Sequence, residues 1–135
     1  MISRPALTTA DVKKMAASAE HEALTHGWAV SIAIVDDGGH LLWLARLDGA
    51  APTSAYIAPA KARTAALGRR ESRVYEELIN GGRMSFLSVP LLDGMLEGGV
   101  PVFVEGHCVG AVGVSGVKSG EDAQIAKAAV AALGV

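Results

Sequence analysis

The sequence predicts a single α+β domain in which helices cover an antiparallel sheet of roughly five strands. Three observations support this prediction. The 135 residues suit one domain that spans the whole chain, 1–135. Strand-like runs come in neighbouring pairs joined by turn residues, which favours antiparallel hairpins over parallel βαβ units. Helix-like segments alternate with these runs in the expected order α-β-β-α-α-β-β-β-α.

The first helix and the first hairpin have clear boundaries. Thr8 can cap the free amides of a helix start, and Asp11 suits the positive end of the helix dipole. The expected buried stripe recurs at helical spacing: Val12, Met15, Ala16, Ala19 and Ala23. Two apolar runs, 28–35 and 40–47, then flank a four-residue turn of Asp and Gly, which predicts a β-hairpin.

Two helices are expected after this hairpin. Residues 61–67 favour helix, and proline is tolerated only in a first helical turn, so Pro59 places the helix start near Ala58. Gly68 is the expected C-cap of this helix. A second, shorter helix is expected over 72–79.

The remaining elements are a weak strand, a second hairpin and a final helix. Residues 83–97 are expected to form a short edge strand, although proline and glycine interrupt the run. The β-rich runs 100–104 and 108–114 predict the hairpin. Ser119 is expected to cap the last helix, with Asp122 at its third position.

Composition narrows the class of partner. Half of the residues are hydrophobic but only 4% are aromatic, and the net charge of -2 comes without a basic stripe, so nucleic acid is not an expected partner. No segment approaches the roughly 18 uninterrupted apolar residues of a membrane span, so no membrane partner is expected. Cys108 is the only cysteine, which favours a reducing, cytoplasmic location. A mean hydropathy of +0.33 in so small a domain predicts apolar surface and self-association into a dimer or a larger assembly.

Five segments, taken together, carry a more specific signal: 30–36, 46–50, 60–65, 98–102 and 110–116. In this order they resemble the GlcG/HbpS-like family, which is often called haem-degrading. The resemblance covers nearly the whole chain. It implies a helix-covered antiparallel sheet, assembly into dimers or larger rings, and haem as a ligand of some members.

The resemblance also gives His21 a role as a candidate axial ligand of haem iron. His21 lies off the apolar stripe of the first helix, and a solvated surface histidine is the alternative interpretation. A zinc site with His26 is rejected, because two histidines five apart lie roughly 140° apart around a helix. No metal site is therefore expected.

Arg46, Asp48 and Lys61 are the candidate ligand-binding or catalytic residues. They come from a strand end, the loop that follows and the next helix, where polar groups converge over a sheet. Arg46 can hold a carboxylate through two parallel hydrogen bonds, and Lys61 can add a charge. The alternative is a structural ion pair between Arg46 and Asp48. The glycines around Ser115 are expected to serve tight packing or an oligomer contact, and Ser115 is expected to offer its hydroxyl to the ligand.

Three functions follow as hypotheses. The first is a cytoplasmic, oligomeric small-molecule-binding protein, with haem or another tetrapyrrole as the ligand that the resemblance implies. The second is an enzyme acting on a small organic acid, in which Arg46 and Lys61 hold the carboxylate and Lys61 or Asp48 moves a proton. The third is a non-catalytic assembly or accessory module.

Overall fold

The computed structural model describes residues 1–135 and contains four α-helices, one 3-10 helix and four strands. In chain order these are α1 (Thr9–Thr25), β1 (Ser31–Asp36), β2 (Leu41–Arg46), α2 (Ser54–Gly68), α3 (Ser72–Asn80), η1 (Met84–Ser88), β3 (Gly99–Val104), β4 (His107–Ser115) and α4 (Ser119–Ala131). None of the helices combines the length and the hydropathy that crossing a membrane requires.

The sheet is antiparallel, as expected, but it has four strands in the order β2-β1-β4-β3. The predicted edge strand over 83–97 is wrong, since this segment forms η1 and an irregular loop. Pro90 has no amide to donate to a strand partner. The Gly94 amide donates to Thr64 Oγ1 of α2 at 3.1 Å, so the loop is tied to a helix and not to the sheet.

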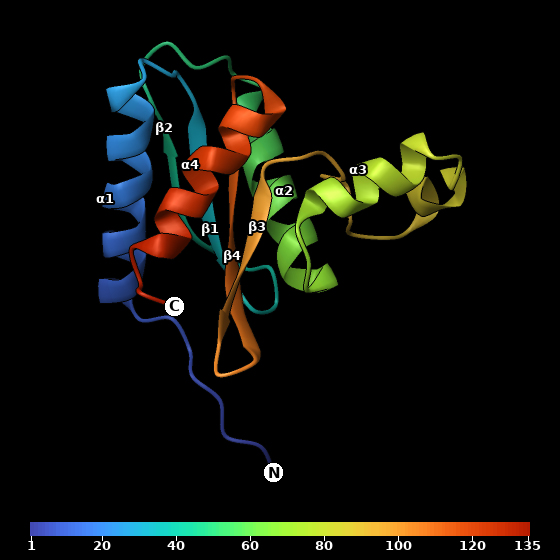
Figure 1. Cartoon of the computed structure of the whole chain (residues 1–135), viewed down its shortest axis with the longest axis horizontal. Helices are drawn as coiled ribbons and strands as arrows, with labels where there is room; N and C mark the ends of the chain where they lie inside the picture. The colour runs from blue at the N-terminus through green and yellow to red at the C-terminus, as the bar shows by residue number, and fades with distance from the viewer.

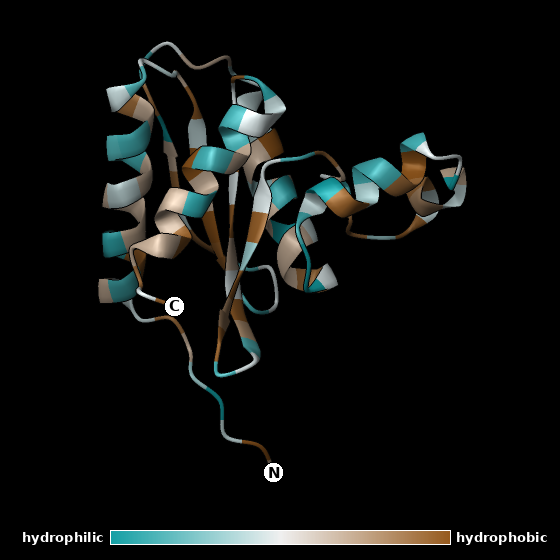
Figure 2. Ribbon diagram, viewed as in Figure 1, coloured by the Kyte–Doolittle hydropathy of each residue, from teal (hydrophilic) through white to brown (hydrophobic).

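Helices cover both faces of the sheet. Figure 1 shows α1 and α4 side by side on one face, with α2 on the other, and α3 with η1 extending away from this body. The larger core lies between the sheet and the α1/α4 pair, and the smaller core lies under α2. In Figure 2 the strands are largely hydrophobic, whereas α1 carries both hydrophilic and hydrophobic residues along its length, as an amphipathic helix should.

The first helix and its stripe are confirmed. Thr8 Oγ1 accepts a hydrogen bond from the Asp11 amide at 3.2 Å, and the Asp11 carboxylate accepts one from the Thr8 amide at 2.8 Å. The buried side of α1 consists of the five residues expected from the spacing: Val12, Met15, Ala16, Ala19 and Ala23. The capping pair thus fixes where α1 begins, and the stripe fixes which side faces the sheet.

The predicted start of α2 is wrong by one turn. The helix begins at Ser54 and runs through Pro59, which lies in its interior. The Ser31 and Ser54 hydroxyls lie 2.7 Å apart and anchor the helix start to β1. Ala58 packs so closely on the sheet that a Cβ at Gly113 of β4 would collide with the Ala58 carbonyl. Tertiary packing therefore outweighs the single hydrogen bond that proline removes.

Two predicted caps are also displaced by one residue. Gly68 is the last residue of α2, and Arg69 adopts the left-handed conformation at its C-cap, with φ of 57°. A side chain at residue 68 would collide with the Tyr75 ring, so Gly68 serves close packing. Ser119 is the first residue of α4, and Lys118 is its N-cap.

Candidate functional site

The cavity that contains two of the predicted residues lies at the edge of the sheet, between α1 and β2. Its volume is about 620 Å³. It is lined by Glu20 and Leu24 of α1, by Gly27, Trp28 and Ala29 of the connection to β1, and by Ala45, Arg46, Leu47 and Asp48 at the end of β2. Five of these nine residues are hydrophobic and three are charged, a mixture that suits a small-molecule site. We call it the α1–β2 cavity.

Arg46 and Asp48 supply charge at the rim of this cavity. Arg46 Nε donates to the Ala50 carbonyl at 3.0 Å, which fixes the side chain at the start of the following loop. Arg46 and Asp48 form no ion pair with each other, in contrast to the structural alternative. The terminal nitrogens of Arg46 are therefore available to a carboxylate.

Lys61 does not join Arg46 and Asp48 at the cavity. It lies seven residues after the start of α2 and is only 3% exposed. Its Nζ donates to the Val114 carbonyl and to the Asp122 carboxylate, both at 3.0 Å. The anion beside Lys61 is thus a side chain of α4, and the pair joins α2, β4 and α4 in the interior.

Asp122 is the second member of this buried pair. Burial raises the pKa of its carboxyl above the usual value, and the ammonium of Lys61 and the Val117 amide offset part of that rise. Gly98 makes room for the pair, because a Cβ there would lie 2.7 Å from the Val114 carbonyl oxygen and 2.8 Å from Lys61 Nζ. The arrangement is closed to solvent and has the character of a structural ion pair.

The two histidines of α1 have different surroundings. His21 is exposed, lies on the side of α1 opposite to the buried stripe, and lines none of the cavities described here. His26 stacks on Trp28 with ring centroids 4.3 Å apart, and its Nε2 lies 2.9 Å from Glu22 Oε1. Trp28, which lines the α1–β2 cavity, is thus stacked against the ring of His26.

Ser115 and Cys108 belong to β4. Ser115 lies opposite Ser31 in the sheet and is 7% exposed, and Ser31 in turn lies opposite Arg46. The three residues therefore form one row across the sheet. Cys108 is a buried free thiol.

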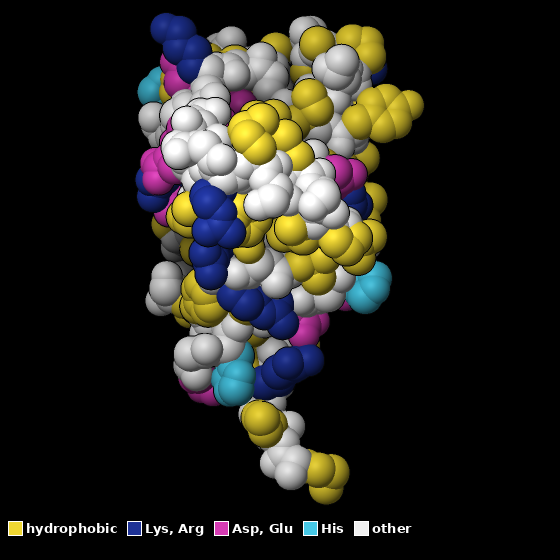
Figure 3. All heavy atoms as spheres, turned by 90° about the vertical axis from the view of Figure 1, so that its right-hand side faces the viewer, with side chains coloured by type: hydrophobic (Ala, Val, Ile, Leu, Met, Phe, Trp, Pro, Cys, Tyr) yellow, Lys and Arg dark blue, Asp and Glu magenta, His cyan; other side chains and the backbone are white.

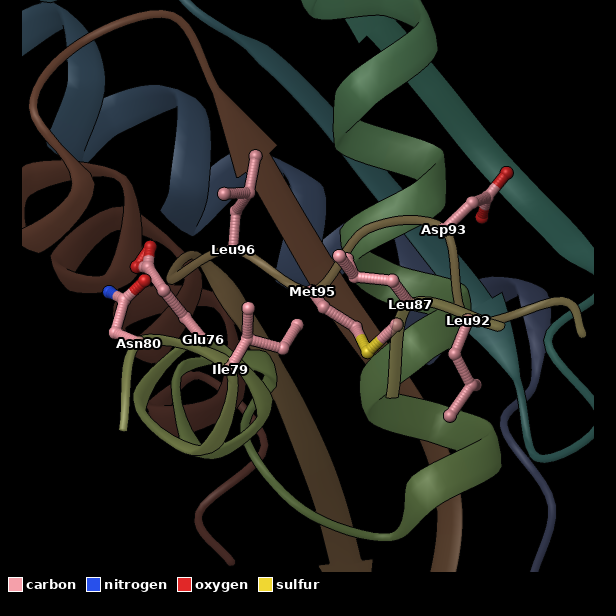
Figure 4. Close-up of a pocket in the computed structure, with 8 residues that line it drawn as sticks. All are labelled: Glu76, Ile79, Asn80, Leu87, Leu92, Asp93, Met95 and Leu96. Carbon is pink, nitrogen blue, oxygen red and sulfur yellow. The ribbon is translucent and has the colours of Figure 1, made fainter. Parts of the chain in front are cut away.

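A second cavity, which the sequence did not indicate, lies where α3 meets η1 and the loop after it. Its volume is about 430 Å³, and its lining residues are Glu76, Ile79, Asn80, Leu87, Leu92, Asp93, Met95 and Leu96. Figure 4 shows Met95 between the residues of α3 and Leu87 of η1. Hydrophobic side chains also gather on the outer face of this region in Figure 3. Sequence reasoning misses this cavity, because five of its eight lining residues fall within the predicted strand 83–97, which does not form.

Comparisons with known proteins agree with this architecture. The family model described as "Haem degrading protein HbpS-like" matches residues 7–131. Protein GlcG of Escherichia coli K12 is 60% identical over 99 residues, which are 73% of either chain.

Two solved structures extend the agreement to three dimensions. A double mutant of Streptomyces reticuli HbpS superposes with a TM-score of 0.89 at 32% identity, over 100% of this chain and 92% of that chain. A structure described as a complex of PduOC with haem superposes with a TM-score of 0.83 at 27% identity, over 95% of each chain. The match along almost the whole sequence, together with the shared fold, shows that this chain belongs to the HbpS-like family.

Proposed function

We propose that this protein binds haem or a related tetrapyrrole in the α1–β2 cavity. The observation that carries the proposal is the combination, in one cavity, of apolar walls with an arginine whose terminal nitrogens are free. The family description and the haem complex of the PduOC relative support haem as the ligand class.

The lining residues suit the two chemical parts of a tetrapyrrole. Leu24, Trp28 and Leu47 would contact the flat macrocycle, and Trp28 is held in place by His26. Arg46 would hold a propionate through charge-assisted hydrogen bonds at the rim. Bound haem would supply redox and oxygen chemistry at its iron, while the chain's own residues orient the ring and exclude water.

Iron ligation requires a residue outside the lining set. The cavity is lined by no histidine, cysteine, methionine or tyrosine, the usual protein ligands of haem iron. His21 follows Glu20 of the lining set in α1, and its ring is exposed. His21 projects from the side of α1 opposite to the buried stripe, so its role as axial ligand, which the resemblance implies, is a separate part of this proposal.

Separate titrations of the purified protein with hemin and with metal-free protoporphyrin IX test the porphyrin site at Arg46 and the iron ligand His21. We expect a shifted Soret band with both porphyrins, and roughly 10- to 100-fold weaker binding of both in Arg46→Ala, because one charge-assisted contact is lost. Arg83→Ala, an exposed arginine near η1, is the matched control and should bind like the wild type. In His21→Ala only the hemin spectrum should change. Absence of a spectral change with either porphyrin would overturn the proposal.

A small organic acid is the second candidate ligand, and the free guanidinium of Arg46 beside Asp48 favours it. In this case Arg46 holds the carboxylate and Asp48 is the group placed to move a proton. Lys61 has no place in such a site, because its Nζ is buried against Val114 and Asp122. Binding of small carboxylates with no response to porphyrins would favour this candidate.

The proposal includes a cytoplasmic location and self-association. The single cysteine, which is free and buried, is consistent with a reducing compartment. Exposed hydrophobic side chains on β2 support association: Leu41, Leu42, Trp43 and Leu44. A stable oligomer that responds to neither porphyrins nor carboxylates would instead indicate an assembly module.

A further inference from the structure

We infer that two copies of this chain associate through the free edge of β2, around a two-fold axis that passes beside Leu44. β2 is the edge strand of the sheet and hydrogen-bonds to β1 alone. An exposed edge strand is a template for another strand, and proteins usually protect it with charge, proline or a covering element.

The middle of β2 carries no such protection, because its one charged residue, Arg46, is the last of the strand, and the bulge in its pairing with β1 lies near its first residue, where Leu41 pairs with Val35. Residues 41–45 are Leu-Leu-Trp-Leu-Ala, without charge or proline. Four large side chains are exposed in this strand: Leu41 by 53%, Leu42 by 43%, Trp43 by 36% and Leu44 by 41%. This apolar edge is therefore suited to burial against a strand of the same kind.

The hydrogen bonding of β2 shows which backbone groups are free. The Leu47 amide donates to the Val30 carbonyl, so Leu47, Ala45 and Trp43 direct their backbone groups toward β1. Leu44, between them, directs its amide and carbonyl outward. Two antiparallel copies can then exchange a pair of hydrogen bonds at Leu44, with the two-fold axis between the two Leu44 residues.

The positions of two charged residues on α1 independently indicate the same two-fold axis beside Leu44. Lys13, Ala17, Glu20 and Leu24 follow one another at helical spacing on the flank of α1 beside β2. Lys13 shares a cavity with Leu42 and Trp43, and Glu20 shares one with Ala45 and Arg46. The midpoint between Lys13 and Glu20 therefore lies level with Leu44.

A two-fold axis at this level brings the two α1 helices together antiparallel, with Lys13 of one copy facing Glu20 of the other. The small side chain of Ala17 lies at the crossing point. Neither Lys13 nor Glu20 forms an ion pair within the chain, so both are free for these two symmetric pairs. The strand and the helix are thus self-complementary about one axis.

The antiparallel arrangement also completes the ligand site, an inference that rests on the proposed function. Because the copies are antiparallel, the α1–β2 cavity of one copy would lie beside Lys13 and Trp43 of the other. The second copy would add a cation and an aromatic ring to the site that Arg46 begins, and the complete ligand site would belong to the dimer.

Sedimentation equilibrium of the ligand-free protein tests the interface. Leu44→Lys places two like charges opposite each other at the axis and should weaken association at least tenfold. Leu87→Lys, on the exposed surface of η1, is the matched control and should associate like the wild type. Thermal melting of both variants checks that they are folded. A monomeric wild type, or unchanged association of a folded Leu44→Lys, would overturn the inference.

A charge exchange tests the arrangement of the helices. Lys13→Glu and Glu20→Lys should each weaken the dimer by roughly tenfold, since each variant places like charges together in both symmetric pairs. The double variant should restore association, because the pairs re-form with reversed sign. Failure of the double variant to recover would contradict the antiparallel contact of α1.

A cross-link tests the register of the strands. Hydrogen-bonded antiparallel pairs have Cα atoms about 5.5 Å apart, which is within reach of a disulfide. Leu44→Cys should therefore form a reducible dimer under oxidising conditions, and Leu42→Cys should not. Cys108 is buried and does not compete. Efficient cross-linking of Leu42→Cys alone would exclude the proposed register.

Hemin titration of Leu44→Lys separates this inference from the proposed function. Weaker binding by the dissociated variant would support a site shared between two copies. Unchanged binding would overturn the shared site, while the interface itself would still be judged by sedimentation. An absence of haem binding in the wild type would overturn the proposed function and would leave the sedimentation result unaffected.

Discussion

Lys61 and Asp122 are charged residues that lie within the packed interior. Lys61 Nζ lies 3.0 Å from the Asp122 carboxylate, and both side chains are buried. Each residue therefore neutralises the charge of the other, which would be costly to bury alone. The pair therefore has a clear effect on stability whichever ligand the protein binds.

Replacement of Lys61 tests this role. Lys61→Met should lower the free energy of unfolding by roughly 3–5 kcal/mol at pH 7, because the Asp122 carboxylate is left buried without its cation. Lys127→Met, which alters an exposed lysine of α4, should change it by less than about 0.5 kcal/mol. Urea denaturation measures both values. Recovery of stability in Lys61→Met combined with Asp122→Asn would identify the unpaired carboxylate as the cause.

The loss of stability in Lys61→Met should depend on pH. The pKa of Asp122 is raised in the folded protein by burial, and loss of Lys61 raises it further. A raised pKa means that the folded state binds the proton more tightly, so its stabilising effect is present at low pH and is lost as the pH rises through the folded pKa. The deficit of Lys61→Met should therefore shrink on acidification below neutral pH. An equal deficit at pH 7 and pH 4.5 would contradict this assignment.

At the scale of elements, α2 lies in close contact with β4. A Cβ at Gly113 would collide with the Ala58 carbonyl and would lie 2.9 Å from the Ala62 side chain. The small residues on both elements allow the helix to lie almost directly on the sheet. This close approach explains why α2 remains regular through Pro59.

Substitution at Gly113 tests the contact. Gly113→Ala should destabilise the protein by roughly 1–3 kcal/mol, since the added methyl group must separate α2 from β4. Gly120→Ala is the matched control, because no atom lies within 4 Å of its Cβ position and its backbone is helical. That control should be neutral or should stabilise α4 by up to about 1 kcal/mol. Chemical denaturation would contradict the argument if the two variants behaved alike.

At the scale of the whole molecule, ligand binding should appear as thermal stabilisation. A ligand at 100 times its Kd adds about 2.7 kcal/mol to the free energy of unfolding, which corresponds to several degrees in Tm for a domain of this size. We expect hemin to raise Tm, and we expect acetate and glycolate at millimolar concentration to leave it unchanged. Stabilisation by the small acids alone, lost in Arg46→Ala, would instead favour the organic-acid site.

The elements that the sequence predicted well are those whose signals are local. The capping pair of Thr8 and Asp11 and the stripe of α1 depend on residues three or four apart, so spacing alone identifies them. Both hairpins follow from turn residues between two apolar runs. The candidate pair of Arg46 and Asp48 was also local, since two residues at one strand end necessarily lie near the same rim.

The features that the sequence missed depend on residues far apart in the chain. Lys61 was expected beside Arg46, but its partner is Asp122, 61 residues later. The predicted edge strand over 83–97 does not form, and Gly94 instead donates a hydrogen bond to Thr64, 30 residues earlier. The cavity beside η1 depends on the path of this same segment.

The sequence by itself determined the family, the α+β class, the two hairpins and the amphipathic first helix, because each of these is recorded in short patterns or in ordered motifs. Only the tertiary structure decided that the sheet has four strands, that Lys61 is buried and that β2 is an exposed apolar edge next to a cavity. Those features arise from which distant surfaces pack together. Spacing along the chain does not specify such packing, because the packing reflects the balance of burial and hydrogen bonding over the whole fold.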